Sequence, residues 1–85
     1  MAAVTIYTTP ICPYCLRAKR LLQQKGATLT EIDVSGDWAA REALVAKSGG
    51  RQTVPQIWIG SRHVGGCDDL FALERAGQLD GLLAG

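Results

Sequence analysis

Two cysteines separated by two residues, Cys12 and Cys15, are the side chains of this sequence best suited to chemistry. They flank Pro13 and Tyr14, follow an apolar run and stand at the head of a helical pattern. With Cys12 at the mouth of that helix and Cys15 one turn inside, the two sulfurs lie close enough to form a disulfide. The free N–H groups and the dipole of a helix N-terminus stabilise an anion, which favours the thiolate of Cys12. The spacing therefore predicts a redox-active dithiol.

Two other interpretations of the cysteines are a structural zinc site and a static disulfide. Four candidate ligands stand at C-x2-C and H-x3-C spacing: Cys12, Cys15, His63 and Cys67. Structural zinc usually holds together small loop-rich modules, whereas this chain is 47% hydrophobic and alternates strand-like and helix-like segments. A static disulfide is typical of secreted proteins, and the pattern of a secretory signal does not precede the first apolar run. We favour redox chemistry and expect no metal.

Length and charge limit the remaining possibilities. A chain of 85 residues forms one small core, which predicts a single domain over residues 1–85. The net charge of +1 offers no electrostatic footprint for nucleic acid or for an anionic membrane, so we expect neither as a partner. Three cysteines, an odd number, suit a catalytic pair and one further thiol in a reducing compartment. We expect a soluble, cytoplasmic monomer.

The elements that must position the cysteines follow from residue periodicity. Residues 4–7 are β-branched and aromatic, which predicts a buried strand directly before the cysteine motif. Residues 13–25 carry apolar side chains at helical spacing, and Gly26 closes the helix. A second strand is predicted at residues 28–34. Because a helix connects these two strands, we expect them to pair in parallel.

The second half of the chain predicts a hairpin between helices. A helix is expected at residues 38–47, and strands at 53–59 and 62–64 are close enough to form an antiparallel hairpin. A third helix begins at residue 67 or 68, and a short last helix carries the leucines of residues 79–83. The resulting order, βαβαββα with a short C-terminal helix, predicts an α/β fold with a mixed four-stranded sheet flanked by helices.

Three motifs, taken together, resemble the dithiol glutaredoxins of the short bacterial type, which belong to the thioredoxin superfamily. They are C-P-Y-C at residues 12–15, T-V-P at 53–55 and G-G-C-D-D at 65–69. A single C-x-x-C is weak evidence, but three motifs in the right order are specific, and the resemblance covers essentially the whole chain. It implies a thioredoxin-like fold and a glutathione-dependent thiol-disulfide oxidoreductase. It also implies substrates that are disulfide-containing or glutathionylated proteins, with ribonucleotide reductase as one candidate.

The resemblance assigns different roles to the two cysteines. Cys12 attacks a disulfide sulfur as a thiolate, and Cys15 frees a bound protein by closing the internal disulfide. On mixed disulfides with glutathione, Cys12 alone can suffice, because a second glutathione thiolate displaces the bound glutathionyl group.

A glutathione site is also implied by the resemblance. Pro55 is expected to be cis and to face Cys12, so that the backbone of Val54 pairs with the cysteine of glutathione like a strand rung. A proline here can also mark a strand edge or a rigid turn. At the start of a helix, free N–H groups suit the γ-glutamyl carboxylate. The residues expected to contact glutathione are Tyr14, Arg41, Thr53, Val54, Pro55, Gly66, Cys67 and Asp68.

The glycine carboxylate of glutathione has more than one candidate contact in this sequence. Many dithiol glutaredoxins carry a lysine three residues before the first cysteine, where this chain has Thr9. Arg41 matches a family position that reaches this carboxylate, although a solvated helix arginine is an equally open interpretation. The Gly-Gly loop looks one residue longer than in its relatives, so Arg51 or Gln52 are alternatives.

Three further residues and two alternative functions have weaker support in the sequence. We expect Trp58 to serve packing or to form edge surface, His63 to be a solvated hairpin residue and Cys67 to be inert. An electron donor reduced by thioredoxin reductase is the alternative enzyme. An iron-sulfur carrier is the alternative from another class, and the bulky Pro13 and Tyr14 argue against it.

Overall fold

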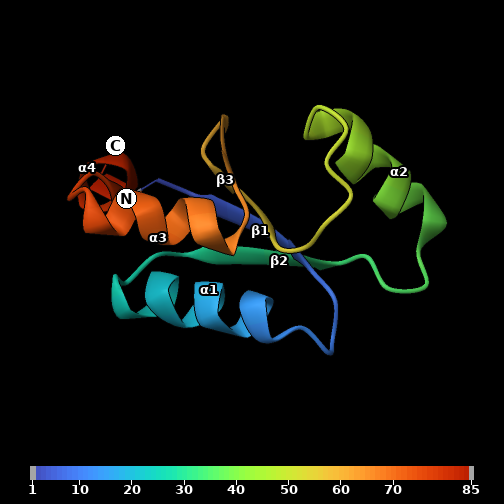
Figure 1. The fold of residues 1–85 in the computed structure, drawn as a ribbon, viewed down its shortest axis with the longest axis horizontal. Helices are drawn as coiled ribbons and strands as arrows, with labels where there is room; N and C mark the ends of the chain where they lie inside the picture. Colours follow the sequence, from blue (N-terminus) through green and yellow to red (C-terminus); the bar gives the residue numbers. More distant parts are fainter. Residues whose placement is uncertain (1, 85) are drawn as a thin grey trace.

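A four-stranded mixed sheet forms the centre of the molecule (Figure 1). The computed structural model describes residues 2–84. In the order β2-β1-β3-β4, the strands are β1 (Val4–Thr8), β2 (Leu29–Asp33), β3 (Gln56–Ile59) and β4 (Arg62–Gly65). β1 pairs in parallel with β2 and antiparallel with β3, and β4 pairs antiparallel with β3. This is the predicted thioredoxin-like arrangement, with β1 and β3 in the middle.

The helices are divided between the two faces of this sheet. They are α1 (Pro13–Gln24), α2 (Trp38–Lys47), α3 (Cys67–Arg75) and α4 (Leu79–Ala84). α1, α3 and α4 share one hydrophobic cluster with the sheet, while α2 contributes Leu44 to a second cluster. Figure 1 shows α1 and α2 on opposite sides of the strands. Among residues 2–84, no helix combines the length and apolar character needed to cross a membrane.

The strands supply side chains to both faces because successive residues of a strand point in opposite directions. In β1, Val4 and Ile6 pack in the cluster of α1, whereas Tyr7 packs in the cluster of α2. Trp58 in β3 is only 4% exposed and meets Tyr7 edge-on, with ring centroids 5.3 Å apart. The expectation that Trp58 serves packing is confirmed.

The predicted elements and their order are confirmed, with small shifts at the boundaries. The strand expected at residues 53–59 begins only at Gln56. Residues 53–55 instead form a loop, as suits a segment with a proline that cannot donate to a strand ladder. β4 continues to Gly65, and its pairing with β3 is irregular between Ile57 and Trp58. The loop and the start of α3 therefore come together beside the cysteine motif.

Candidate active site

Cys12 caps the N-terminus of α1 with its own sulfur. Its backbone is extended, with φ −146° and ψ 100°, and Pro13 follows at the first turn. The Cys12 Sγ accepts a hydrogen bond from the backbone N–H of Cys15 at 3.1 Å. The sulfur thus lies where free N–H groups and the helix dipole stabilise negative charge. This position matches the one predicted from the sequence.

Cys15 lies on the inner side of the same helix turn and is only 2% exposed. Burial, together with the hydrogen bond to Cys12 and the charge there, raises the pKa of the Cys15 thiol to about 12. Cys15 is therefore a neutral thiol near pH 7, while Cys12 is partly exposed. Both are free thiols in this structure. The site presents one accessible sulfur with a second, protected thiol beside it.

The loop before β3 faces the accessible sulfur. The Val54–Pro55 peptide bond is cis, as predicted. The Cys12 thiol points at the Val54 carbonyl, with 3.9 Å between sulfur and oxygen, a weak hydrogen bond. Backbone atoms of Val54 are therefore available next to the reacting sulfur.

Gln56 holds this loop in place through side-chain hydrogen bonds, a role that the sequence did not predict. The side chain is 0% exposed, and its Nε2 donates to the Thr53 carbonyl at 3.0 Å and to the Thr53 Oγ1 at 3.3 Å. Its Oε1 lies 2.8 Å from the Nε2 of His63. Because the Gln56 amide nitrogen is used on Thr53, the amide oxygen accepts here and His63 donates. The sequence feature that could have indicated this role is a glutamine in an otherwise apolar strand.

His63 is not the solvated hairpin residue that we expected. It is partly buried and stacks on Trp58, with ring centroids 4.5 Å apart. The correction has a simple cause: His63 pairs with Trp58 across the hairpin, which brings the imidazole over the indole and next to Gln56. Burial, and then the charge of Arg51, lower the pKa of His63. The imidazole is therefore a neutral positioning group.

The start of α3 approaches the loop closely because two glycines precede it. Gly65 has φ +115°, and a Cβ at this position would collide with the Asp69 carboxylate. The Asp69 Oδ2 accepts from the Gly66 N–H at 2.9 Å and pairs with Arg51 at 3.3 Å. The bond from Gly66, and then Arg51, lower the pKa of Asp69. A Cβ on Gly66 would lie 3.4 Å from the Pro55 carbonyl.

A groove of about 500 Å³ lies between the loop and α3. It is lined by Tyr14, Arg51, Thr53, Val54, Pro55, Gly66, Cys67, Asp68 and Asp69. The structure thus brings together every expected glutathione contact except Arg41, and it adds Arg51 and Asp69. Cys67 is 6% exposed, and burial raises the pKa of its thiol. A protonated thiol is the unreactive form of cysteine.

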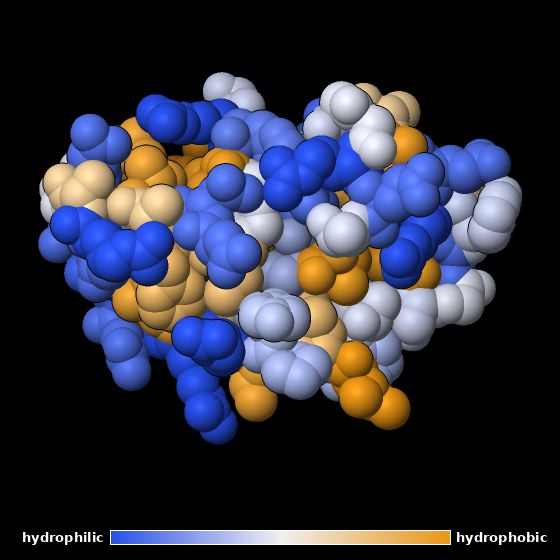
Figure 2. Space-filling view, viewed as in Figure 1, coloured by the Kyte–Doolittle hydropathy of each residue, from blue (hydrophilic) through white to orange (hydrophobic). Residues whose placement is uncertain are grey.

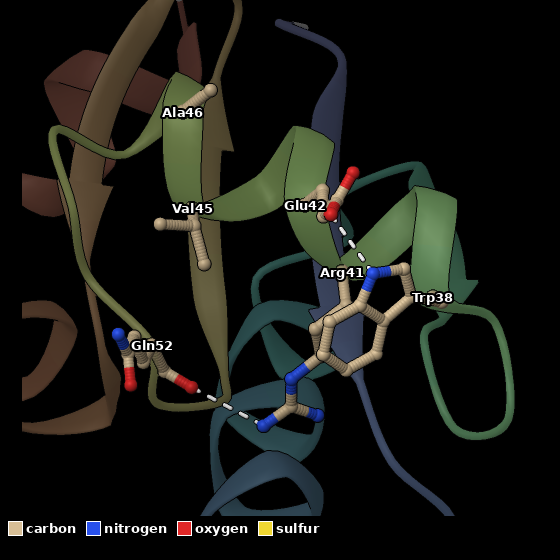
Figure 3. A pocket seen from close by; sticks show the side chains of 6 residues that line it. All are labelled: Trp38, Arg41, Glu42, Val45, Ala46 and Gln52. Carbon is tan, nitrogen blue, oxygen red and sulfur yellow. Dashed lines mark hydrogen bonds between the residues drawn. The ribbon is translucent and has the colours of Figure 1, made fainter.

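Arg41 lies on the other side of the loop. Its guanidinium, on α2, donates to the Gln52 carbonyl at 3.2 Å (Figure 3). It borders a hollow of about 370 Å³ that also contains Thr9, and Thr9 in turn borders the hollow around Cys12. Arg41 therefore lies near Thr9, the position at which many dithiol glutaredoxins have a lysine. It lies outside the groove that Arg51 lines.

The four residues considered for zinc are not gathered into a metal centre. Within residues 2–84, no group of three or more His, Cys, Asp or Glu side chains is arranged to hold a metal ion. His63 is bonded to Gln56, and Cys67 is buried in the cluster of α1 and α3.

A thioredoxin-like fold with two free thiols, C-x-x-C, at the mouth of its first helix defines a thiol-disulfide oxidoreductase. The family model for glutaredoxin matches residues 4–64. The chain belongs to the glutaredoxin family.

Individual relatives agree with this assignment over nearly the full chain. A glutaredoxin of Pseudomonas aeruginosa is 61% identical over 84 residues, covering 99% of each chain. Glutaredoxin 3 of Escherichia coli K12 is 54% identical over 83 residues, covering 98% of this chain and 99% of that protein. The crystal structure of a buckwheat glutaredoxin-glutathione complex has a TM-score of 0.88 and 32% identity, covering 98% of this chain and 77% of that chain.

Proposed function

We propose that this glutaredoxin uses glutathione to reduce glutathione mixed disulfides and protein disulfides through Cys12 and Cys15. The observation that carries the proposal is the accessible Cys12 sulfur facing the Val54 carbonyl, beside a groove that ends at the N-terminus of α3. The similar buckwheat protein, crystallised as a glutathione complex, supports the choice of co-substrate. Reduced glutathione and free thiols belong to reducing compartments, so we place the reaction in the cytoplasm.

The proposed reaction on a glutathione mixed disulfide needs one protein sulfur. The Cys12 thiolate attacks the glutathionyl sulfur, the S–S bond breaks, and the released substrate thiolate takes up a proton. A second glutathione thiolate then attacks the glutathionyl sulfur on Cys12. This step forms glutathione disulfide and restores the Cys12 thiolate.

A protein disulfide requires Cys15 as well. After Cys12 has joined the substrate sulfur, the Cys15 thiolate attacks the Cys12 sulfur, which forms the Cys12–Cys15 disulfide and releases the substrate as a dithiol. Two glutathione molecules then reduce this disulfide and leave as glutathione disulfide. In the reduced protein, the hydrogen bond and charge at Cys12 help to keep Cys15 protonated. Both disappear once Cys12 is in a mixed disulfide, so the pKa of Cys15 falls when its thiolate is needed.

We place glutathione along the loop before β3. Its cysteine pairs with the backbone of Val54, and its γ-glutamyl carboxylate lies at the N–H groups of Cys67 and Asp68 in the first turn of α3. The Asp68 carboxylate meets the α-ammonium. Tyr14, Thr53 and Pro55 form the walls. The glycine carboxylate then points towards Arg41 and Thr9, at the opposite end of the loop from α3.

The test of this function is the choice of reductant. With NADPH and glutathione reductase, the protein should reduce the mixed disulfide of glutathione and cysteamine at a rate that depends on added glutathione. A reaction with NADPH and thioredoxin reductase in place of glutathione serves as the control. Turnover with the flavoprotein alone, and none with glutathione, would contradict the proposal.

The proposed contact between Arg41 and the glycine carboxylate of glutathione gives a second prediction. Arg41→Ala should raise the KM for a glutathione mixed disulfide several-fold with little change in kcat, because a charge-assisted contact contributes about 1.5 to 3 kcal/mol at best and less when exposed. Thr9→Lys should lower KM, since it returns a cation beside the same hollow. Steady-state kinetics on the purified variants measure both effects.

Arg51→Ala is the matched control for the contact between Arg41 and the glycine carboxylate. Arg51 lines the groove and pairs with Asp69, on the γ-glutamyl side of the proposed site. Arg41→Lys separates charge from shape, because it keeps the cation and loses the planar fork of donors. If Arg51→Ala raises KM while Arg41→Ala does not, the glycine carboxylate has been assigned to the wrong arginine.

A further inference from the structure

A second groove, of about 490 Å³, lies along α2 and away from α3. Figure 3 shows Trp38, Arg41 and Glu42 on one side of it and Gln52 on the other, with Val45 between them. The floor and one wall are apolar, formed by the indole, Val45 and Ala46. Apart from Arg41, no residue of its lining that is named here takes part in the reaction steps or the glutathione contacts proposed above.

Trp38 is held in place although its side chain is 77% exposed. Its Nε1 donates to the Glu42 Oε1, one turn further along α2, at 2.8 Å. A restrained aromatic side chain loses little conformational freedom on binding, and such residues commonly anchor protein interfaces. The indole therefore offers a ready apolar surface at the mouth of the groove.

The other exposed large apolar side chains surround the reactive cysteine. Within residues 2–84, these are Ile11, Tyr14 and Leu16, and Ile11 is 94% exposed. Figure 2 shows a hydrophobic protrusion over the loop between β1 and α1, where Ile11 lies. Exposed apolar surface is thus found at two places: around Cys12 and along α2.

Arg41 and the loop before β3 connect these two places. Arg41 borders both the α2 groove and the hollow of Thr9, which adjoins the hollow around Cys12. Gln52 forms the far wall of the α2 groove, and two residues later the Val54 carbonyl faces the Cys12 sulfur. The α2 groove therefore continues the site in the direction of Arg41.

We propose that the α2 groove binds the polypeptide of a protein disulfide substrate on the C-terminal side of its reactive cysteine. This inference rests on the proposed placement of glutathione, whose chain ends with the glycine carboxylate at Arg41. A protein substrate paired with Val54 in the same direction does not end there. Its next residues, each advancing about 3.3 Å when extended, run past Arg41 into the groove.

The lining of the groove defines the chemistry of the segment that it accepts. Trp38, Val45 and Ala46 fit a bulky aliphatic or aromatic side chain two or three residues after the cysteine. Arg41 donates to Gln52 through one nitrogen, and its guanidinium carries further N–H donors that suit a substrate carbonyl. The groove therefore distinguishes protein substrates from glutathione, which is too short to reach it.

Three capped peptides test this inference. The short peptide is glycine-cysteine-glycine. The second peptide has two leucines added at the C-terminal end of this sequence, and the third has two leucines added at its N-terminal end. In all three, the cysteine forms a mixed disulfide with 2-nitro-5-thiobenzoate. Attack by the Cys12 thiolate breaks this S–S bond, joins Cys12 to the peptide sulfur and releases the coloured thiolate. Stopped-flow absorbance gives the second-order rate constant for the first turnover.

We expect the peptide with leucines after cysteine to react about tenfold faster than the short peptide, as for one anchoring contact. Trp38→Ala should remove this advantage and leave the short peptide unaffected, while Trp38→Phe should restore part of it. Val45→Asp, which puts a charge on the groove floor, should act like Trp38→Ala. The short peptide also reports correct folding of each variant.

Two results would overturn the inference. One is equal rates for all three peptides with the unaltered protein. The other is an advantage for the peptide with leucines before cysteine, which would reverse the direction of binding. Failure of the proposed function is separate, because it appears as loss of glutathione-dependent turnover while the preference among peptides persists.

Discussion

Cys12→Ser is expected to reduce all disulfide-reducing activity to the uncatalysed background. The Cys12 sulfur lies at the mouth of α1 and is the accessible thiol of the C-x-x-C pair, whereas Cys15 and Cys67 are buried. A serine hydroxyl is far less acidic than a thiol and forms no disulfide, so neither the attack nor the mixed disulfide is possible. Glutathione-coupled reduction of a glutathione mixed disulfide and of a protein disulfide measures the loss.

The same substitution should leave the fold intact, which makes the result easy to interpret. Serine is a favoured N-cap, and its oxygen can accept the N–H of Cys15 as the sulfur does. Thermal unfolding of Cys12→Ser should therefore occur close to that of the unaltered protein. Residual turnover above background in a well-folded Cys12→Ser protein would remove Cys12 from the proposed role of nucleophile.

Cys15→Ser should separate the two kinds of substrate. Reduction of a glutathione mixed disulfide should largely persist, because a second glutathione thiolate can release the glutathionyl group from Cys12. Reduction of a protein disulfide should fall strongly, because the covalent complex with Cys12 then lacks its resolving thiol. The two rates, measured on one protein preparation, give the comparison directly.

The trapped complex supplies a second measurement for Cys15→Ser. A protein disulfide substrate should accumulate as a covalent adduct on Cys12, visible by mass spectrometry and reversed by added thiol. Equal losses on both substrates, without an adduct, would contradict the division of roles between the cysteines. Cys15 is 2% exposed, so thermal unfolding must be measured as well to detect any packing defect.

Most of the fold was predictable because its signals are local. The β-branched strand before the cysteines and the amphipathic pattern of α1 set these elements without knowledge of the rest of the chain. Glycines close the helices, and the strand-helix-strand connection implied the parallel pairing of β1 and β2. The two cysteines were found for the same reason, since their spacing alone places both sulfurs on one helix turn.

The contacts that position the loop before β3 were not predictable in this way. The bonds from Gln56 to Thr53 and His63 depend on the exact register of the hairpin and on where the strand begins. For Arg41, the sequence indicated a helix residue and, by resemblance, a contact with the glycine carboxylate, but no contact with the loop. Its contact with the Gln52 carbonyl requires the path of the loop between α2 and β3, which no residue pattern defined.

The hydrophobic clusters on the two faces of the sheet differ in size, and this difference determines which helix detaches first in partial unfolding. α2 is held by a small cluster of Tyr7, Val34, Leu44 and Trp58, whereas α1, α3 and α4 share a much larger one. Partial unfolding follows the weakest packing, so α2 can detach at a lower free energy than the helix that carries the cysteines. Breathing of α2 would loosen the groove of Trp38 while the redox centre keeps its native packing.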